Sequence, residues 1–70
     1  MQREDVERRV AALRAKTDQY NYDNERLHVE EDQLHHDVLS AIATGNAVDP
    51  AGCAEAALAT LEINYERWYE

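Results

Sequence analysis

The first forty-four residues of this chain contain neither glycine nor proline. Because these two residues most often end a helix, nothing in the stretch forces a helix to stop. Mainly apolar residues recur there in alternating steps of four and three positions. This is the seven-residue repeat of a left-handed coiled coil. The pattern predicts one helix over about residues 3–43, roughly 60 Å long. The repeat is formed by Val6, Val10, Leu13, Thr17, Tyr20, Asn24, Leu27, Glu31, Leu34, Val38 and Ala41.

A second helix is predicted after a short connection. Gly45 suits the left-handed residue that caps a helix, and Asp49 followed by Pro50 is a typical helix start. Helical spacing then continues, so we expect this helix over about residues 50–69. A connection this short makes the two helices antiparallel neighbours. The sequence therefore predicts an all-α helical hairpin that forms a single domain over residues 1–70. The apolar stripe of its second helix is Ala54, Ala57, Leu58, Leu61, Tyr65 and Trp68.

The two predicted helices differ in length by about a factor of two. Folded back, the shorter one can cover only about residues 22–43 of the longer one. The apolar stripe before residue 22 is then left in water, which is unfavourable, so a second copy should cover it. We expect a homodimer that forms a coiled-coil-like helical bundle, with a tetramer as the alternative. Beside the main seam, a second and weaker apolar line runs through Tyr22, Val29, His36, Leu39 and Ala43.

Charge favours an antiparallel homodimer. That orientation places the basic residues between 8 and 16 near the acidic residues between 30 and 37 of the other copy. A parallel dimer would set Arg9 beside Arg14 of its mate, although it would also pair Asp23 with His28. Exposed pairs each contribute under about 1 kcal/mol, so the parallel form stays open. The expected dimer interface consists of Val6, Val10, Leu13, Tyr20, Asn24, Leu27, Leu34, Val38 and Trp68.

The net charge of −8 also bears on partners. Residues 17–70 hold twelve acids against Arg26 and Arg67 alone. Such a balance opposes contact with phosphate backbones, so no nucleic-acid partner is expected, whereas a basic protein partner is. We see no apolar run that could act as a signal peptide or cross a membrane, so the sequence predicts a cytoplasmic protein without membrane contact.

The histidines form the one pattern that suggests metal chemistry. Glu25 and His28, like Asp32 and His35, show the acid-x-x-His spacing that ferritin-like di-iron bundles use, because residues three apart share a helix face. A pattern this short arises often by chance in an acidic helix. The alternative interpretation is that the histidines flank the seam and pair with nearby carboxylates. We therefore predict no cofactor and keep a metal-binding helical bundle as the second hypothesis.

No pattern in the sequence indicates an enzyme. There is no glycine-rich phosphate loop, no cysteine pair and no nucleophile elbow. Cys53 lies in an alanine-rich stretch, where a small packing residue is expected. The sequence favours a small acidic helical module for oligomerisation or protein interaction, acting as a regulator or adaptor.

Overall fold

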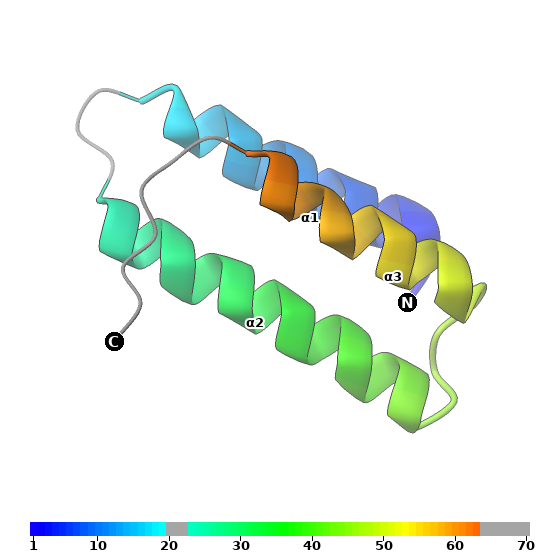
Figure 1. Ribbon diagram of the computed structural model, residues 1–70. Coiled ribbons are helices and arrows are strands. Elements are labelled where there is room, and N and C mark those ends of the chain that lie inside the picture. Colours follow the sequence, from blue (N-terminus) through cyan, green and yellow to red (C-terminus); the bar gives the residue numbers. More distant parts are fainter. Residues whose placement is uncertain (20–22, 64–70) are drawn as a thin grey trace.

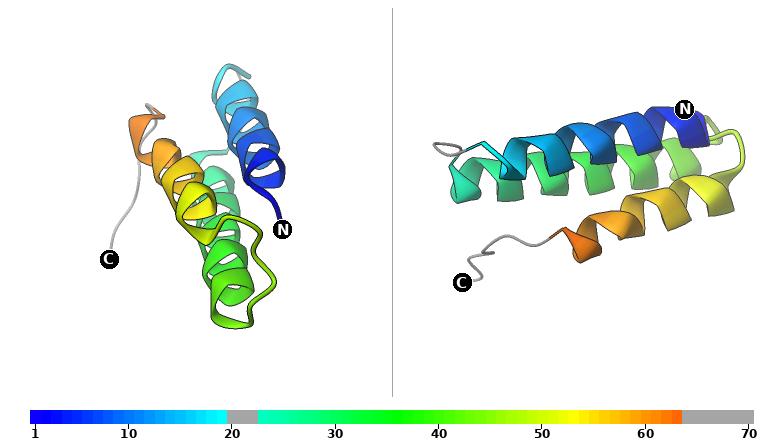
Figure 2. Two further views of the ribbon diagram at one scale, coloured as in Figure 1. Left: turned by 90° about the vertical axis from the view of Figure 1, so that its right-hand side faces the viewer. Right: turned by 90° about the horizontal axis from the view of Figure 1, so that it is seen from above.

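The computed structural model describes residues 1–19 and 23–63 of the chain. Three α-helices run over Arg3–Thr17 (α1), Asn24–Ala43 (α2) and Pro50–Leu58 (α3), and a 3₁₀ helix, η1, follows at Ala59–Glu62. Each helix packs against the other two, with α2 antiparallel to both α1 and α3 (Figure 1). Viewed end-on, the three helices stand at the corners of a triangle (Figure 2). The described residues thus form an all-helical bundle without strands.

The prediction of one helix over residues 3–43 is wrong, because the chain breaks it into α1 and α2. The first helix ends at Thr17, the chain turns at Asp18, and the second helix begins at Asn24. The carboxylate of Asp23 accepts a hydrogen bond of 2.9 Å from the backbone N–H of Glu25 and so caps α2. Short polar side chains of this kind compete for backbone hydrogen bonds, which favours helix ends over helix interiors.

The break gives the apolar stripe of α1 a partner within its own chain. Folding back places the buried face of α1 against α2 and α3, which removes that face from water. The core consists of Val6, Val10, Leu13, Leu27, Leu34, Val38, Cys53, Ala56, Ala57 and Ile63. All the core residues of α1 and α2 are positions of the seven-residue repeat, so the repeat does predict which side chains are buried.

The connection between α2 and α3 follows the sequence signals. Gly45 has a φ of +76°, the left-handed conformation expected after a helix. The carboxylate of Asp49 accepts a hydrogen bond of 3.2 Å from the N–H of Gly52, and Pro50 occupies the first turn of α3. The predicted helix start at residue 50 is therefore confirmed.

The helix predicted over residues 50–69 corresponds to α3 and is shorter than expected. The α-helix ends at Leu58 and tightens into η1, and the backbone at Ile63 is extended. Thr60 and Ile63 are β-branched and therefore weaker helix formers, and both are buried in the bundle, at 0% and 4% exposure. The part of the prediction that covers residues 64–69 lies outside the described residues.

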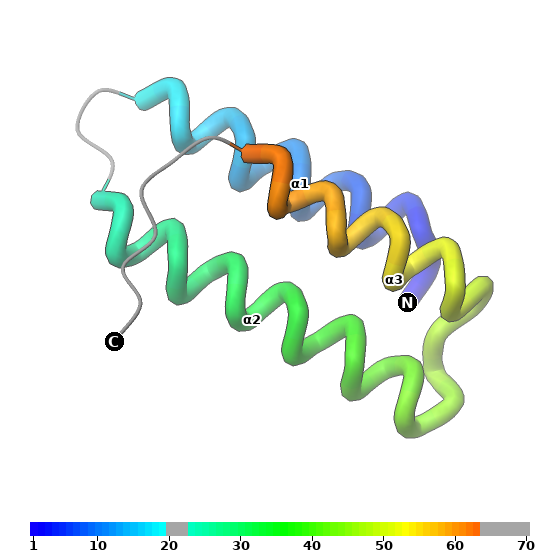
Figure 3. The backbone as a smooth tube through the Cα atoms, in the orientation of Figure 1, coloured from blue at the N-terminus to red at the C-terminus, as the bar shows by residue number. Residues whose placement is uncertain are grey.

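The start of the chain is joined to the connection between α2 and α3. The N-terminal ammonium group of Met1 donates a hydrogen bond of 2.8 Å to the carbonyl oxygen of Asn46. The backbone N–H of Val48 donates one of 2.7 Å to the carbonyl oxygen of Met1. In Figure 3 the N-terminus lies at the end of the bundle where α3 begins. The first and third helices therefore begin at the same end of the bundle and run in the same direction.

Candidate functional site: the outer face of α2 and α3

The residues predicted to form a dimer interface lie mostly inside one chain. Six of them are at most 7% exposed, and Asn24 is half-buried at the start of α2. The expectation that a second copy must cover the apolar stripe of α1 is therefore wrong, because this stripe packs against α2 and α3 of the same chain; dimerisation itself stays a prediction. Tyr20 and Trp68 lie outside the described residues. The six buried residues are Val6, Val10, Leu13, Leu27, Leu34 and Val38.

The predicted attraction between basic and acidic stretches occurs within the chain. The guanidinium of Arg9 lies 2.8 Å from the carboxylate of Asp37, and the ammonium of Lys16 lies 2.7 Å from the carboxylate of Glu30. Both ion pairs join α1 to α2. The hydrogen bond from Arg9, together with one from Gln33, holds the pKa of Asp37 below its ordinary value. These pairs fix the alignment of the two antiparallel helices.

A further ion pair joins α1 to α3. Arg3 lies 3.0 Å from the carboxylate of Glu55 and 3.3 Å from that of Glu7. The hydrogen bond to Glu55 is the larger cause that raises the pKa of Arg3 above its ordinary value. Cationic groups of α1 are thus turned toward acids of the same chain.

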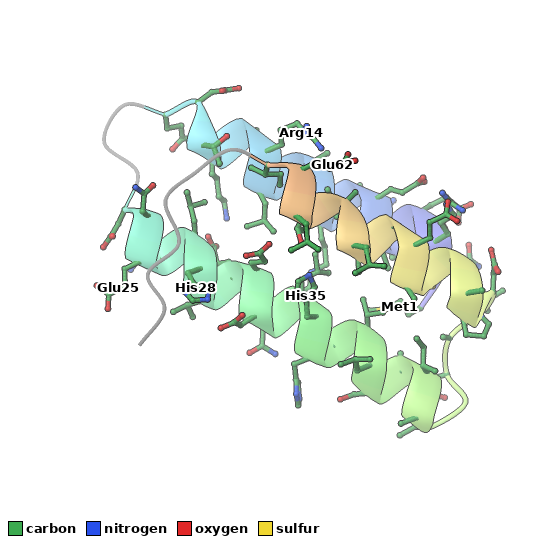
Figure 4. All side chains as sticks on the ribbon, viewed as in Figure 1. Met1, Arg14, Glu25, His28, His35 and Glu62 are labelled. Atoms are coloured by element: carbon green, nitrogen blue, oxygen red, sulfur yellow. The ribbon has the colours of Figure 1, made fainter. Side chains whose placement is uncertain are left out.

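The four candidate metal ligands do not come together as the acid-x-x-His spacing predicted. The Nε2 atom of His28 lies 3.5 Å from a carboxylate oxygen of Asp32, four residues later, and Glu25 is exposed at the start of α2. Figure 4 shows Glu25, His28 and His35 spread along α2. Among residues 1–19 and 23–63, no three histidine, cysteine or carboxylate side chains are grouped so that they could hold a metal ion.

His35 contacts α3 instead. Its Nε2 lies 2.9 Å from the hydroxyl of Thr60 and 3.3 Å from the carbonyl oxygen of Ala57. The Thr60 hydroxyl donates its own hydrogen to that carbonyl oxygen, at 3.0 Å. The hydroxyl therefore accepts from His35, and Nε2 carries the hydrogen. His35 thus serves as a polar link between α2 and α3.

Three leucines on the outside of α2, α3 and η1 remain in water. Leu39 is 65% exposed, Leu58 59% and Leu61 61%. Leu39 and Leu58 flank an apolar groove of about 270 Å³ between α2 and α3, whose floor includes Ala54 and Ala57. Leu61 follows Ala54, Ala57 and Leu58 in the spacing of one helix face. We call Leu39, Leu58, Leu61 and this groove the α2–α3 face.

This face was only partly visible in the sequence. Leu39 belongs to the second apolar line, whose Val29 is also 63% exposed. Leu58 and Leu61 were expected to pack on the first helix, and the structure exposes them. The alanines are the reason, since their small side chains leave a groove between α2 and α3 that Leu39 and Leu58 flank without filling. The alanine-rich stretch was the available signal.

The charges around the α2–α3 face are mainly negative. The exposed charged residues of α2, α3 and η1 are Glu25, Arg26, Asp32, Glu55 and Glu62, four acids and one base. Asp32 lies seven residues before Leu39 and therefore on the same side of α2. The face thus has Asp32 and Glu62 at its margin, whereas Glu55 is paired with Arg3 of α1 and Glu25 lies at the other end of α2.

The remaining features define what the bundle offers chemically. The thiol of Cys53 is completely buried, within 3.4 Å of the carbonyl oxygen of Val48. Over the described residues, no helix combines the length and the apolar character needed to cross a bilayer. The α2–α3 face is the feature best suited to contact another molecule.

Comparisons with protein-family models, curated proteins and solved structures found no match to this chain.

Proposed function

We propose that this chain is a protein-interaction module without catalytic activity, and that the α2–α3 face is its docking surface. The observation that carries the proposal is the exposure of Leu39 and Leu58 on an apolar groove, with Leu61 exposed three residues further along the chain. The core is filled by other residues, so these leucines are not needed to complete it. Contiguous exposed apolar surface of this kind marks sites where proteins bind one another.

The partner that fits this face is an amphipathic helix with basic flanks. A groove between two helices accepts apolar side chains spaced along one side of a third helix. The surrounding acids, among them Asp32 and Glu62, attract lysine and arginine beside those side chains. A second copy would present the same acids, and two-fold pairing through this face would bring like charges together. A basic partner is therefore favoured over self-association at this surface.

Metal binding has less support. His35 is hydrogen-bonded to Thr60, and Glu25 lies at the far end of α2 from the α2–α3 groove. The hydrogen bond to Thr60 occupies Nε2 of His35 and leaves only Nδ1 for a metal, and no three potential ligands are grouped among the described residues. The geometry therefore favours the interaction module over the metal-binding alternative.

Two model peptides test the docking surface. Both carry leucine at positions i, i+3, i+4 and i+7 of a helical repeat; one has lysine at the flanking positions and the other has glutamate. We expect the lysine peptide to bind, and Leu58→Glu, which replaces an apolar side chain by a carboxylate and keeps the surface acidic, to weaken binding by at least tenfold. Ala15→Glu is the matched control, because Ala15 is exposed on α1, away from this face. Equal binding of the lysine peptide by both variants would contradict the proposal.

A photo-crosslinking experiment extends the test to natural partners. A photoreactive residue replaces Leu58 in one variant and Ala15 in another, and both are expressed in cells. We expect a discrete adduct from position 58 only, and the captured protein, once purified, should lose affinity for Leu58→Glu but not for Ala15→Glu. Adducts of equal yield at both positions, or adducts containing only a second copy of the chain, would argue against a basic partner on this face.

A further inference from the structure

The contacts of α1 point to a second mode of association, which involves a second copy of the chain and does not depend on the α2–α3 face. Val6, Val10 and Leu13 of α1 pack into a core that α2 and α3 otherwise supply. A connection of only six residues, 18–23, joins α1 to the rest of the chain. We infer that two copies can exchange α1, so that α1 of each copy packs against α2 and α3 of the other.

Every contact that holds α1 can be formed between chains as well as within one. The ion pairs Arg9–Asp37 and Lys16–Glu30 connect α1 to α2, and Arg3–Glu55 connects α1 to α3. Neither these pairs nor the apolar contacts require that both partners belong to the same chain. Exchange of an element therefore yields a dimer that keeps the native contacts of two monomers.

The phase of the seven-residue repeat provides an independent argument. Leu13, the last core residue of α1, and Leu27, the first of α2, are fourteen residues apart, which is two whole repeats. In the three-helix bundle the connection between α1 and α2 can have any length. The seven-residue repeat of α2 then need not continue the repeat of α1 in register. A dimer in which α1 and α2 of one chain lie in line does need that phase, because one face must stay buried across both helices. The sequence thus has a regularity that the single-chain fold does not require.

The composition of the connection agrees with this inference. Between Thr17 and Asn24 the sequence has no glycine or proline, so the break between the helices depends on polar residues such as Asp23, which caps α2. The connection between α2 and α3, in contrast, contains Gly45 in the left-handed conformation and ends at Pro50. Exchange at the first connection therefore requires no glycine or proline to leave its preferred conformation. Because exchange costs mainly the freedom of two separate molecules, the dimer fraction rises with concentration.

Charge reversal on two different chains tests the exchange. The first variant carries Arg9→Asp and Lys16→Glu, and the second carries Glu30→Lys and Asp37→Arg. Each variant alone places like charges between α1 and α2, both as a monomer and as an exchanged homodimer. In the exchanged heterodimer, the acidic α1 of the first variant meets the basic α2 of the second. The unchanged basic α1 of the second variant also meets the unchanged acidic α2 of the first. Both contacts between α1 and α2 in the heterodimer therefore join opposite charges.

The two variants are mixed in equal amounts, unfolded in urea, refolded by dialysis and weighed by native mass spectrometry. We expect the heterodimer to exceed each homodimer by at least tenfold, well above the twofold excess of random mixing. A single chain with all four reversals is the control, because it restores both pairs within one chain. Only monomers, or heterodimers at the random ratio, would overturn the inference.

A second measurement needs no substitution. Lys16 and Glu30 lie 2.7 Å apart, so a carbodiimide can join them directly by an amide bond, with loss of water to the reagent. Wild-type chains with ¹⁵N and with ¹⁴N are refolded together over a range of concentrations and then cross-linked. We expect the cross-linked peptides to include pairs of mixed isotope, in a fraction that grows with concentration. Pairs of one isotope only, at every concentration up to about millimolar, would show that α1 stays with its own chain.

Discussion

The two sides of α2 are built in different ways. Toward α1, large apolar side chains meet, and the ion pairs Arg9–Asp37 and Lys16–Glu30 flank them. Toward α3, α2 meets small residues such as Ala57 and is linked to Thr60 through His35. The first side buries its large side chains, and the second leaves leucines in water.

This difference separates packing from recognition. On the α1 side, apolar burial supplies the stabilisation and the charges fix the alignment of two antiparallel helices. On the α3 side, small residues line a groove between the two helices, and the large side chains flank that groove without filling it. One helix can therefore support the core with one side and offer an apolar docking surface with the other.

The sharpest test of this comparison is a pair of leucines on α2. Leu34 is 1% exposed and Leu39 is 65% exposed, although both are leucines of one helix. Leu34→Ala is expected to lower the free energy of unfolding by about 3 kcal/mol, because it leaves a cavity in the core. Leu39→Ala is expected to change it by no more than about 0.5 kcal/mol. Urea unfolding followed by circular dichroism measures both, and similar losses would mean that Leu39 belongs to the core.

Removing the polar link between α2 and α3 is expected to cause the next largest loss in the free energy of unfolding. Thr60 is completely buried, and its hydroxyl lies between the His35 ring and the carbonyl oxygen of Ala57. Thr60→Val keeps the volume but removes that hydroxyl, so we expect a loss of about 1–2 kcal/mol. In a His35→Ala background the same change should cost less, since one partner is already absent. Equal costs in both backgrounds would show that the two side chains are not coupled.

The two connections show how far the sequence predicts the fold. Gly45, Asp49 and Pro50 have conformational signatures, and the second connection was predicted from them. The first connection has a helix-capping residue, Asp23, but no glycine or proline, and its break also depends on the burial of residues 6–13 against the rest of the chain. That burial is a tertiary effect, which local sequence signals do not contain.

The seven-residue repeat had a similar limit. It identified the buried side chains of α1 and α2, and the distribution of charge indicated which stretches attract each other. Neither pattern states whether the two partners belong to one chain or to two. The exposed leucines could not be read from spacing either, because Leu58 and Leu61 follow a helical stripe that is usually buried. Their exposure depends on how closely α3 approaches α2.

Removing the N-terminal cap of α3 is expected to have a smaller effect on the free energy of unfolding. Asp49 accepts a hydrogen bond from Gly52 and holds a left-handed φ of +58°. Asp49→Ala removes the cap and places a less tolerant residue in that conformation, so we expect a loss of about 1 kcal/mol. Asp49→Asn should retain most of the stability, because asparagine also caps helices and accepts left-handed backbone. Thermal unfolding of both variants distinguishes the cap from the mere presence of a charge.

The smallest expected effect on stability comes from Asp37, on the side of α2 that faces α1, and it depends on pH. The hydrogen bonds from Arg9 and Gln33 keep the pKa of Asp37 below its ordinary value of 3.8, so the folded chain binds this proton more weakly than the unfolded chain does. The stabilisation is therefore complete well above pH 3.8 and is lost as the pH falls through the lower pKa of the folded state.

Asp37→Asn tests this linkage against the wild-type chain. The variant should have a slightly lower urea midpoint at pH 7, because the Arg9 guanidinium then faces a neutral amide. The gap should narrow as the pH falls below 3.8, since the wild-type carboxyl becomes neutral as well. Gln33→Ala, which removes only the weaker of the two hydrogen bonds, should show the same trend with a smaller gap. A gap that stays constant from pH 7 to strongly acidic solution would mean that Asp37 contributes through packing, and that the charges on this side of α2 do not stabilise the contact with α1.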